Sequence, residues 1–253
     1  MHTLLISDLH LTPERPRVVV AFENFLQQEA SGCDALYILG DLFEAWIGDD
    51  DPAPLSRRVI EALAALSRRG TQLYFTHGNR DFAVGKRFAR ETGCHILDDH
   101  CVKTLYGRRY LLLHGDTLCS DDKTYQRVRR LTRNPVLLAL LRNLPLATRQ
   151  KIAEGGRARS AAHTGNQPDY ILDVNSAAVS AALMRFQVDT MIHGHTHRPG
   201  DHRVALPSGD TGRRIVLGDW DTQGWVVKVD ATGPTLSSFP IESLDNRATR
   251  SAP

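Results

Sequence analysis

Short apolar runs, each ending in polar residues, recur along most of the chain. Runs of this length are typical of strands that are buried on both faces of a sheet. They are Thr3 to Ser7, Ala35 to Leu39, Gln72 to Thr76, Tyr110 to Leu113, Thr190 to Ile192 and Arg214 to Leu217. Segments with helical periodicity, Val18 to Glu29 and Leu55 to Arg69, lie between the first three runs, and Gly70 follows the second segment at a C-cap position. Alternating strands and helices predict a layered α/β core.

The carboxyl-terminal third has a different pattern. Its apolar runs, Ile215 to Leu217, Trp225 to Val229 and Leu236 to Phe239, are separated by Gly and Pro rather than by helical segments. This spacing is typical of antiparallel strands. Together the two patterns predict one mixed sheet or two packed sheets.

A basic and apolar segment interrupts the core pattern. Residues 123–159 contain ten Lys and Arg and one acid, Glu154, together with the run Val136 to Leu141. A helical insertion of this composition, at about residues 122–167, is either a lid or interface-lying element or a helical hairpin packed on the core with solvated arginines. We expect a single domain over residues 1–253, with a frayed tail at 245–253.

The composition is that of an ordinary globular protein. The chain of 253 residues has 31 Lys and Arg against 29 Asp and Glu, which gives a formal charge of +2. With 42% hydrophobic and 24% charged residues, it has enough apolar side chains for a sizeable core. These values exclude a polycation, an acidic tail and a largely disordered chain.

We expect neither a signal peptide at the amino terminus nor a membrane-spanning helix. The longest apolar run, Val136 to Leu141, is far short of the roughly 20 residues that a membrane helix needs. The first residues lack a basic start, and Asp8 precedes any signal-peptide core. The four cysteines form no C-x-x-C pair, which argues against a zinc knuckle and favours buried reduced thiols. We expect a cytosolic protein.

Polar clusters follow five of the predicted strands at the point where each strand ends. They are Asp8-x-His10, Gly40-Asp41, Gly78-Asn79-Arg80-Asp81, His114-Gly115-Asp116 and Gly194-His195-Thr196-His197. Ligands of open α/β sheets bind at the carboxyl ends of the strands. We therefore expect the five clusters to build one site.

The side chains of these clusters suit divalent cations. Residues two apart along an extended chain point to the same side, so Asp8 and His10, and likewise His195 and His197, can share an ion. Imidazole, carboxylate and amide ligands without a thiolate favour manganese, iron, zinc or magnesium. Seven candidate ligands are too many for one ion and indicate two, with Asp41 as the bridge: Asp8, His10, Asp41, Asn79, His114, His195 and His197.

The series of five clusters, in this order, resembles the calcineurin-like metallophosphoesterase superfamily. The resemblance implies a four-layer α/β/β/α sandwich of two mixed sheets flanked by helices. It also implies one metal on Asp8, His10, Asp41 and His197 and a second on Asp41, Asn79, His114 and His195.

Longer motifs are similar to a narrower family, the UDP-2,3-diacylglucosamine pyrophosphatases of Gram-negative lipid A biosynthesis. They are the stretch from Tyr37 to Asp50, Gly85 to Ala89, His114 to Cys119 and His193 to Pro199. The resemblance implies cleavage of UDP-2,3-diacylglucosamine to UMP and 2,3-diacylglucosamine 1-phosphate with two Mn²⁺, by attack on the α-phosphorus. It also implies a peripheral protein at the anionic cytoplasmic face of the inner membrane.

Substrate contacts are also implied by this narrower resemblance. Asp122 and Ser160, which bracket the insertion, are implied to bind substrate, and the apolar insertion from Leu137 to Leu146 is expected to line a slot for acyl chains. Thr164 and Gln167 stand where the family commonly has Asn and Lys, which puts the contacts there in doubt. We expect the aromatic side chains of Phe43, Trp46 and Tyr125 to belong to the core.

Arg80 indicates the kind of bond that is broken. The superfamily commonly has a histidine after the asparagine, and a histidine can protonate an alkoxide leaving group. An arginine cannot, because its pKa stays above about 12. A phosphate leaving group has a second pKa of roughly 6 and needs mainly its charge neutralised, so Arg80 favours a pyrophosphate substrate. The alternative is a structural salt bridge from Arg80 to Asp81 or elsewhere.

We predict in-line attack on phosphorus by a water that two metals activate. Asp41 bridges the ions, and Asn79, Arg80 and His195 bind the substrate and meet the developing charge. Another two-metal phosphoesterase acting on soluble nucleotides or phosphodiesters is the alternative enzyme, and a binding module without metal chemistry is a third interpretation. The small net charge and 7% aromatic residues argue against a nucleic-acid partner, and we expect a monomer.

Overall fold

The computed structural model describes residues 1–165, 171 and 173–242, without the side chains of residues 160–165. The elements follow in the order β1 (Thr3–Ile6), α1 (Pro16–Gln28), β2 (Ala35–Ile38), α2 (Pro54–Arg68), β3 (Gln72–Phe75), α3 (Lys86–Thr92), β4 (Cys94–Ile96), β5 (His100–Leu105), β6 (Arg108–Leu113), a 3-10 turn (Asp116–Leu118), α4 (Lys123–Thr132), α5 (Pro135–Arg142), α6 (Leu146–Gly165), α8 (Ser176–Phe186), β7 (Thr190–His193), β8 (Gly200–Ala205), β9 (Thr211–Val216), β10 (Gln223–Asp230) and β11 (Gly233–Pro240). The predicted strands and both predicted helices are confirmed, with ends that differ by a few residues.

The strands form two mixed sheets within the described residues. The first has the order β11-β10-β1-β2-β3-β4, in which β1 to β4 are parallel and β10 and β11 are antiparallel additions at one side. The second has the order β5-β6-β7-β9-β8, with β6, β7 and β9 parallel and an antiparallel strand at each side. The expectation of two mixed sheets is confirmed.

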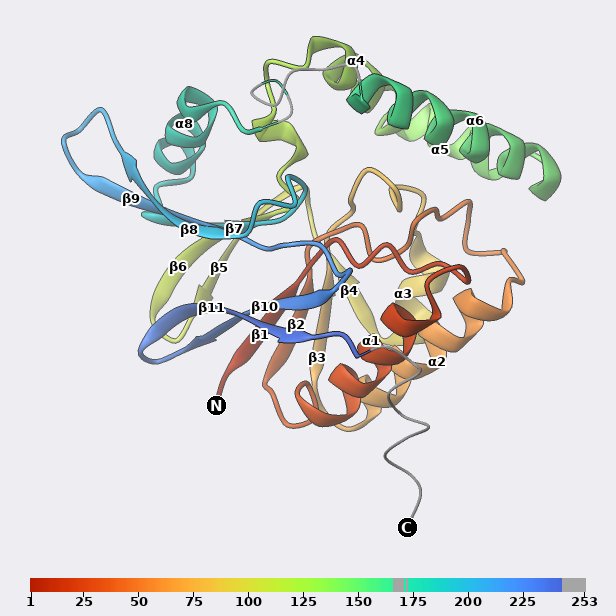
Figure 1. The fold of residues 1–253 in the computed structure, drawn as a ribbon, viewed down its shortest axis with the longest axis horizontal. Helices are drawn as coiled ribbons and strands as arrows, with labels where there is room; N and C mark the ends of the chain where they lie inside the picture. The colour runs from red at the N-terminus through yellow and green to blue at the C-terminus, as the bar shows by residue number, and fades with distance from the viewer. Residues whose placement is uncertain (166–170, 172, 243–253) are drawn as a thin grey trace.

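Alternating side chains of β1 show how the layers are held together. Leu4 and Ile6 belong to the core beneath α1, α2 and α3, whereas Leu5 belongs to the core between the two sheets. A third cluster joins Leu111 and Met191 of the second sheet to α8. Figure 1 shows α1, α2 and α3 outside the first sheet and α8 outside the second. Since successive side chains of a strand point to opposite faces, each sheet buries both faces and the result is the four-layer α/β/β/α sandwich.

Helices α4, α5 and α6 lie apart from the two sheets, above the loops at the upper right of Figure 1. Within the described residues, no helix combines the length and the apolar character that crossing a bilayer requires. Four arginines of these helices bind the rest of the molecule. Arg129 binds Asp99 and Asp116, Arg133 binds the carbonyl oxygens of His77 and Gly78, Arg142 binds those of Ala83 and Val84, and Arg149 binds Asp50. The interpretation in which the arginines only form a solvated face is therefore wrong for these four.

The most buried of these four arginines is Arg149, whose side chain is only 3% exposed. Its Nη1 donates to Asp50 Oδ1 and to the carbonyl oxygen of Ile47, both at 2.7 Å, and its Nε donates to the carbonyl oxygen of Leu144 at 2.9 Å. Gly48 makes room for it, because a Cβ there would lie 2.1 Å from Arg149 Nη1. A guanidinium fork suits this bidentate arrangement, which joins α6 to the loop after β2.

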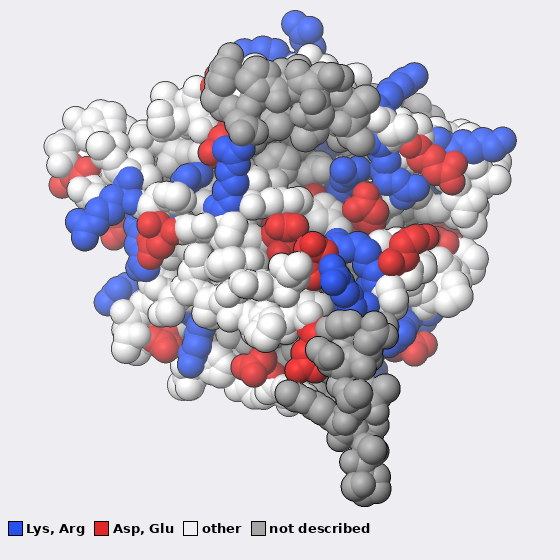
Figure 2. Space-filling view, in the orientation of Figure 1, with Lys and Arg blue, Asp and Glu red and all other residues white. Residues whose placement is uncertain are grey.

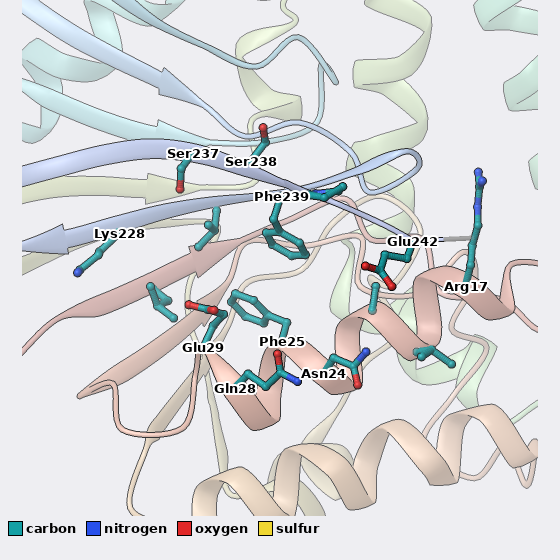
Figure 3. Close-up of a pocket in the computed structure, with 15 residues that line it drawn as sticks. Arg17, Asn24, Phe25, Gln28, Glu29, Lys228, Ser237, Ser238, Phe239 and Glu242 are labelled. Atoms are coloured by element: carbon teal, nitrogen blue, oxygen red, sulfur yellow. The ribbon is translucent and has the colours of Figure 1, made fainter. Parts of the chain in front are cut away.

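A groove of about 560 Å³ lies between α1 and the strands β10 and β11. Figure 3 shows Phe25 of α1 and Phe239 of β11 facing each other in it, and their ring centroids are 5.9 Å apart. Arg17, Glu29 and Lys228 lie around its edge. No residue that the sequence singles out for chemistry lines this groove, so the candidate site lies elsewhere.

Arg149→Ala should loosen α5 and α6 from the body of the protein. Hydrogen bonds to charged groups are worth about 1.5–3 kcal/mol each, so amide hydrogen exchange in residues 135–150 should accelerate at least about tenfold. Hydrogen exchange followed by mass spectrometry measures this, with Arg130→Ala, which removes an exposed arginine of α4, as the control. Equal exchange in the two variants would show that the Arg149 contacts do not hold the helices.

Candidate metal and phosphate site

The candidate ligands lie together at the carboxyl ends of parallel strands from both sheets. Asp8 and His10 follow β1, Asp41 follows β2, Asn79 and Arg80 follow β3, His114 follows β6, and His195 and His197 follow β7. The two sheets of the sandwich therefore contribute side chains to a single site. Two overlapping groups of these residues, Asp8 with His10 and His197 and Asp8 with Asp41 and His114, offer ligand atoms within 4.8 Å of one another.

One half of the site combines Asp8, His10 and His197. His10 Nε2 lies 3.3 Å from His197 Nε2, and His197 Nε2 lies 3.5 Å from Asp8 Oδ1. The other oxygen of Asp8 accepts hydrogen bonds from the Ser7 hydroxyl at 2.6 Å and from the backbone N–H of His195 at 2.9 Å. Asp8 Oδ1 is buried and accepts no hydrogen bond from the described residues. An oxygen of this kind fits a cation that the carboxylate would bind.

The other half combines Asn79, His114 and His195. Asn79 Oδ1 lies 3.0 Å from both His114 Nε2 and His195 Nδ1, and these two ring nitrogens are 3.2 Å apart. His114 Nδ1 lies 2.8 Å from the carbonyl oxygen of Leu39, so it must carry the proton. His114 Nε2 then presents its lone pair to the centre, which is the tautomer that a metal ligand requires.

Asp41 lies between the two halves. Its Oδ2 is 3.9 Å from His10 Nε2 and 3.7 Å from His114 Nε2, and its Oδ1 accepts the backbone N–H of Arg80 at 2.8 Å. The carboxylate is 2% exposed. This is the position that a bridging ligand would need, and the bridging role stays a prediction.

Five of the seven candidate ligands have left-handed backbone conformations. The φ angles are 56° for Asp8, 48° for His10, 52° for Asp41, 71° for His195 and 54° for His197. Non-glycine residues rarely adopt such angles, and where they do the surrounding structure enforces them, often at functional sites. The pairs Asp8 and His10, and His195 and His197, thus reach one centre, but not along an extended chain as the sequence argument supposed.

A buried carboxylate that sequence reasoning did not assign holds two of the ligand loops in register. Asp81 accepts the backbone N–H of Leu42 at 2.8 Å and that of Gly78 at 2.7 Å. Burial and the nearby Asp41 raise its pKa to about 6. Among the described residues Arg80 forms no ion pair with Asp81, so that part of the alternative is wrong, but an ion pair elsewhere, with Glu44, is present. Arg80 Nη1 lies 3.7 Å from Glu44.

The imidazoles of the two halves of the site have different pKa values. Burial and the nearby His114 together lower the pKa of His195 to about 4, so His195 is neutral at pH 7 and able to bind a metal. Burial lowers the pKa of His197 too, but contact with Asp8 reverses this and raises it to about 9. Burial raises the pKa of Asp8, yet His197 and the other nearby imidazoles bring it below its usual value. Asp8 is therefore an anion in the folded protein.

The start of the insertion reaches this site through Tyr125. Its ring centroid is 5.7 Å from that of His195, and its hydroxyl donates to Asp116 at 2.9 Å. The expectation that Tyr125 is a core residue is wrong, whereas Phe43 and Trp46 are buried in the main core as expected. Its partner Asp116 belongs to the quoted cluster that begins with His114, but nothing in the sequence joins that cluster to Tyr125.

The implied substrate contacts lie at the two ends of the insertion. Asp122 caps α4 by accepting the backbone N–H of Tyr125 at 2.8 Å, so it is one helical turn from the ring that faces His195. Ser160 and Thr164 belong to α6, but their side chains lie outside the described residues, as does Gln167. Their contacts with substrate stay predictions.

The donor set fits divalent metal ions. It offers carboxylate, imidazole and amide atoms and no thiolate, a combination that suits Mn²⁺, Fe²⁺, Zn²⁺ or Mg²⁺.

Comparison with known proteins gives a family match and close sequence relatives. The family model for calcineurin-like phosphoesterases matches residues 1–199. The UDP-2,3-diacylglucosamine hydrolase of Serratia proteamaculans is 52% identical over 241 residues, 95% of this chain and 100% of that protein. The protein of the same name from Pseudomonas paraeruginosa is 50% identical over the same shares. The structure of an archaeal phosphodiesterase matches 95% of this chain and 99% of its own, at 14% identity and a TM-score of 0.49. The two sequence relatives align along almost the entire chain.

Asp41→Asn should weaken divalent-ion binding while leaving the fold intact. The amide oxygen can still accept the Arg80 N–H, and Asp81 still joins the neighbouring loops, but the bridging charge is lost. Loss of this charge should lower the affinity for Mn²⁺ by at least about tenfold in calorimetric titration of metal-free protein. Thermal unfolding without metal is the control for folding. Unchanged Mn²⁺ affinity in a folded variant would remove Asp41 from the metal site.

Proposed function

Because the chain belongs to the calcineurin-like phosphoesterase family, we propose that it hydrolyses UDP-2,3-diacylglucosamine in lipid A biosynthesis. The reaction breaks the pyrophosphate bond and yields UMP and 2,3-diacylglucosamine 1-phosphate. The observation that carries this assignment is the identity of 52% with the Serratia hydrolase over that protein's full length. The convergent ligand set at the strand ends agrees with it.

Arg80 supports a pyrophosphate rather than a simple phosphomonoester as substrate. Its Nε is buried and has no hydrogen-bonding partner within the described residues, so this donor is left unsatisfied there. Its side chain is 23% exposed, so part of it can contact a phosphate oxygen. A fixed cation neutralises the charge of a leaving phosphate, which needs no proton to depart.

The remaining residues of the site have complementary roles in this proposal. Two Mn²⁺ would be held by the seven ligands, with Asp41 between them, and would lower the pKa of the attacking water and neutralise phosphate oxygens. Asn79 and His195 lie next to each other and next to His114, so they would orient the phosphate whose phosphorus is attacked. His195 is neutral, and with the lone pair on Nδ1 its Nε2–H can donate to an oxygen of that phosphate. We assign the attack to the α-phosphorus.

Apolar side chains on the inserted helices would accommodate the acyl chains. Several are exposed although they are large and hydrophobic: Val128, Leu131, Val136, Leu137, Leu140, Leu144 and Ile152. A substrate with two acyl chains needs such a surface, and a soluble nucleotide does not. Asp122 and Ser160 would bind the polar part of the substrate between this surface and the metals.

The same helices would bring the protein to the anionic cytoplasmic surface of the inner membrane. Figure 2 shows Lys and Arg projecting from the upper margin of the molecule, where α4 to α6 lie. Exposed basic residues there include Lys123, Arg127, Arg130 and Lys151. Basic and apolar side chains on one amphipathic element favour an anionic lipid interface. The protein would be a monomeric single domain that binds this surface peripherally and does not bind nucleic acid.

The substrate assignment predicts strong discrimination between nucleotides. Metal-free protein supplied with Mn²⁺ should hydrolyse UDP-2,3-diacylglucosamine in detergent micelles at least about a hundredfold faster than UDP-glucosamine or bis(p-nitrophenyl) phosphate. Chelation should abolish turnover, and Mn²⁺ should restore it. Comparable rates on the three substrates would instead favour a general two-metal phosphoesterase that acts on soluble nucleotides or phosphodiesters.

Leu140→Glu should raise KM for the diacylated substrate at least about tenfold, because a charge replaces an apolar contact with an acyl chain. The affinity for UMP should stay unchanged, since UMP has no acyl chain. Leu140 is 61% exposed, so the folded protein should tolerate the change. KM measurements and UMP inhibition test this, and an equal loss for both ligands would contradict the acyl slot.

A further inference from the structure

Glu44 lies on a loop whose backbone is fixed to two parts of the site. Its backbone N–H donates to the carbonyl oxygen of Leu11 at 3.1 Å, next to His10. Two residues further on, the N–H of Trp46 donates to the carbonyl oxygen of Arg80 at 3.1 Å. The loop after β2 therefore connects the loop after β1 with the loop after β3, and Glu44 lies between them.

The Glu44 carboxylate contacts a candidate metal ligand and the phosphate-binding arginine with different oxygens. Oε2 lies 3.2 Å from His10 Nδ1, and Oε1 lies 3.7 Å from Arg80 Nη1. The Glu44 side chain is 33% exposed, so it is partly shielded from water. A single carboxylate is thus placed to act on both groups.

For His10 this charge contact favours a proton on Nδ1, although the ring N–H is not aligned for a hydrogen bond to Glu44. His10 Nε2 points to the centre of the site, 3.3 Å from His197 Nε2 and 3.9 Å from Asp41 Oδ2. A neutral imidazole has one N–H and one lone pair, so a proton on Nδ1 that faces Glu44 leaves the lone pair on Nε2. Metal-binding histidines commonly have a carboxylate beside their second nitrogen, and Glu44 occupies that position at His10.

For Arg80 the contact restrains the guanidinium. Glu44 attracts Nη1, while the backbone N–H of Arg80 is held by Asp41 and its carbonyl oxygen by Trp46. The Nε has no partner among the described residues, and the side chain is 23% exposed, so part of it can still contact phosphate. Ordering a long side chain before substrate arrives lowers the entropy cost of using it.

We propose that Glu44 is a positioning residue that orients His10 towards the metal and Arg80 towards the substrate phosphate. The part that concerns Arg80 rests on the function proposed above, whereas the part that concerns His10 does not. Glu44 belongs to the quoted stretch from Tyr37 to Asp50, and nothing in the sequence pattern gave it a role in chemistry.

Two substitutions separate the two contacts. Glu44→Ala removes both, whereas Glu44→Gln keeps an oxygen that can accept the His10 N–H but loses the charge that attracts Arg80. Glu23→Gln, which makes the same change in a surface ion pair with Arg58, is the matched control. Mn²⁺ affinity is measured by calorimetric titration of metal-free protein, and kcat for UDP-2,3-diacylglucosamine at saturating Mn²⁺, with thermal unfolding as the check on folding.

Glu44→Ala should weaken Mn²⁺ binding about 10- to 100-fold and also lower kcat about tenfold. Glu44→Gln should retain Mn²⁺ affinity close to that of the wild type but lose kcat as the Ala variant does. In an Arg80→Ala background, Glu44→Gln should have no further effect on kcat, because its partner is already absent.

Wild-type Mn²⁺ affinity in a folded Glu44→Ala variant would overturn the His10 part. Equal kcat losses for Glu44→Gln with and without Arg80 would overturn the Arg80 part. If wild-type protein fails to hydrolyse UDP-2,3-diacylglucosamine, the proposed function fails, and the Mn²⁺ titrations still decide the role of Glu44 at His10.

Discussion

The close approach of the loops that follow β1, β2 and β3 is the constraint on which the candidate site depends. A Cβ on Gly40 would lie 2.6 Å from the backbone nitrogen of Gly78, and a Cβ on Gly78 would lie 2.1 Å from Asp41 Oδ1. The backbone N–H groups of Asp8 and His10 bind the carbonyl oxygens of Gly40 and Asp41 at 3.1 and 3.0 Å. Glycine is needed at both contact points because no side chain fits there. The ligand positions are therefore set mainly by backbone hydrogen bonds.

The sequence predicted that the candidate ligands converge, because each of them lies shortly after a buried strand. Parallel strands bring their carboxyl ends to one edge of a sheet. The position of a polar residue that follows such a strand can therefore be predicted from the sequence alone. The left-handed conformations of Asp8 and His10 could not be predicted in this way, since they arise from hydrogen bonds to the loop after β2. Tyr125 was also out of reach, because its place beside His195 depends on how α4 returns to the body.

The insertion shows the limit of reasoning from composition. Residues 123–159 contain ten basic residues. The sequence does not distinguish those that bind the two-sheet core and its loops from those that face solvent. Arg133 and Arg142 bind backbone carbonyl oxygens near β3 and α3, and carbonyl groups carry no sequence signature. Arg149 differs, because its contacts do involve particular side chains. Asp50 is its ion-pair partner, and Gly48 leaves room for the guanidinium. Large apolar side chains of the same insertion stay exposed.

The first helix of the insertion, α4, interacts electrostatically with the candidate metal site through Asp116. Asp116, two residues after His114, is 2% exposed, and a buried carboxylate is costly unless it is paired. Burial raises its pKa, but His114 and Arg129 outweigh this and hold it below its usual value. Arg129 and Tyr125 of α4 supply hydrogen bonds at 2.7 and 2.9 Å, so α4 cannot leave without exposing or unpairing this charge. Helices α5 and α6 bind instead to outer loops through Arg142 and Arg149. The polar end of a substrate would therefore contact α4, which is held firmly. Its apolar end would contact α5 and α6, whose attachment depends on a few arginines.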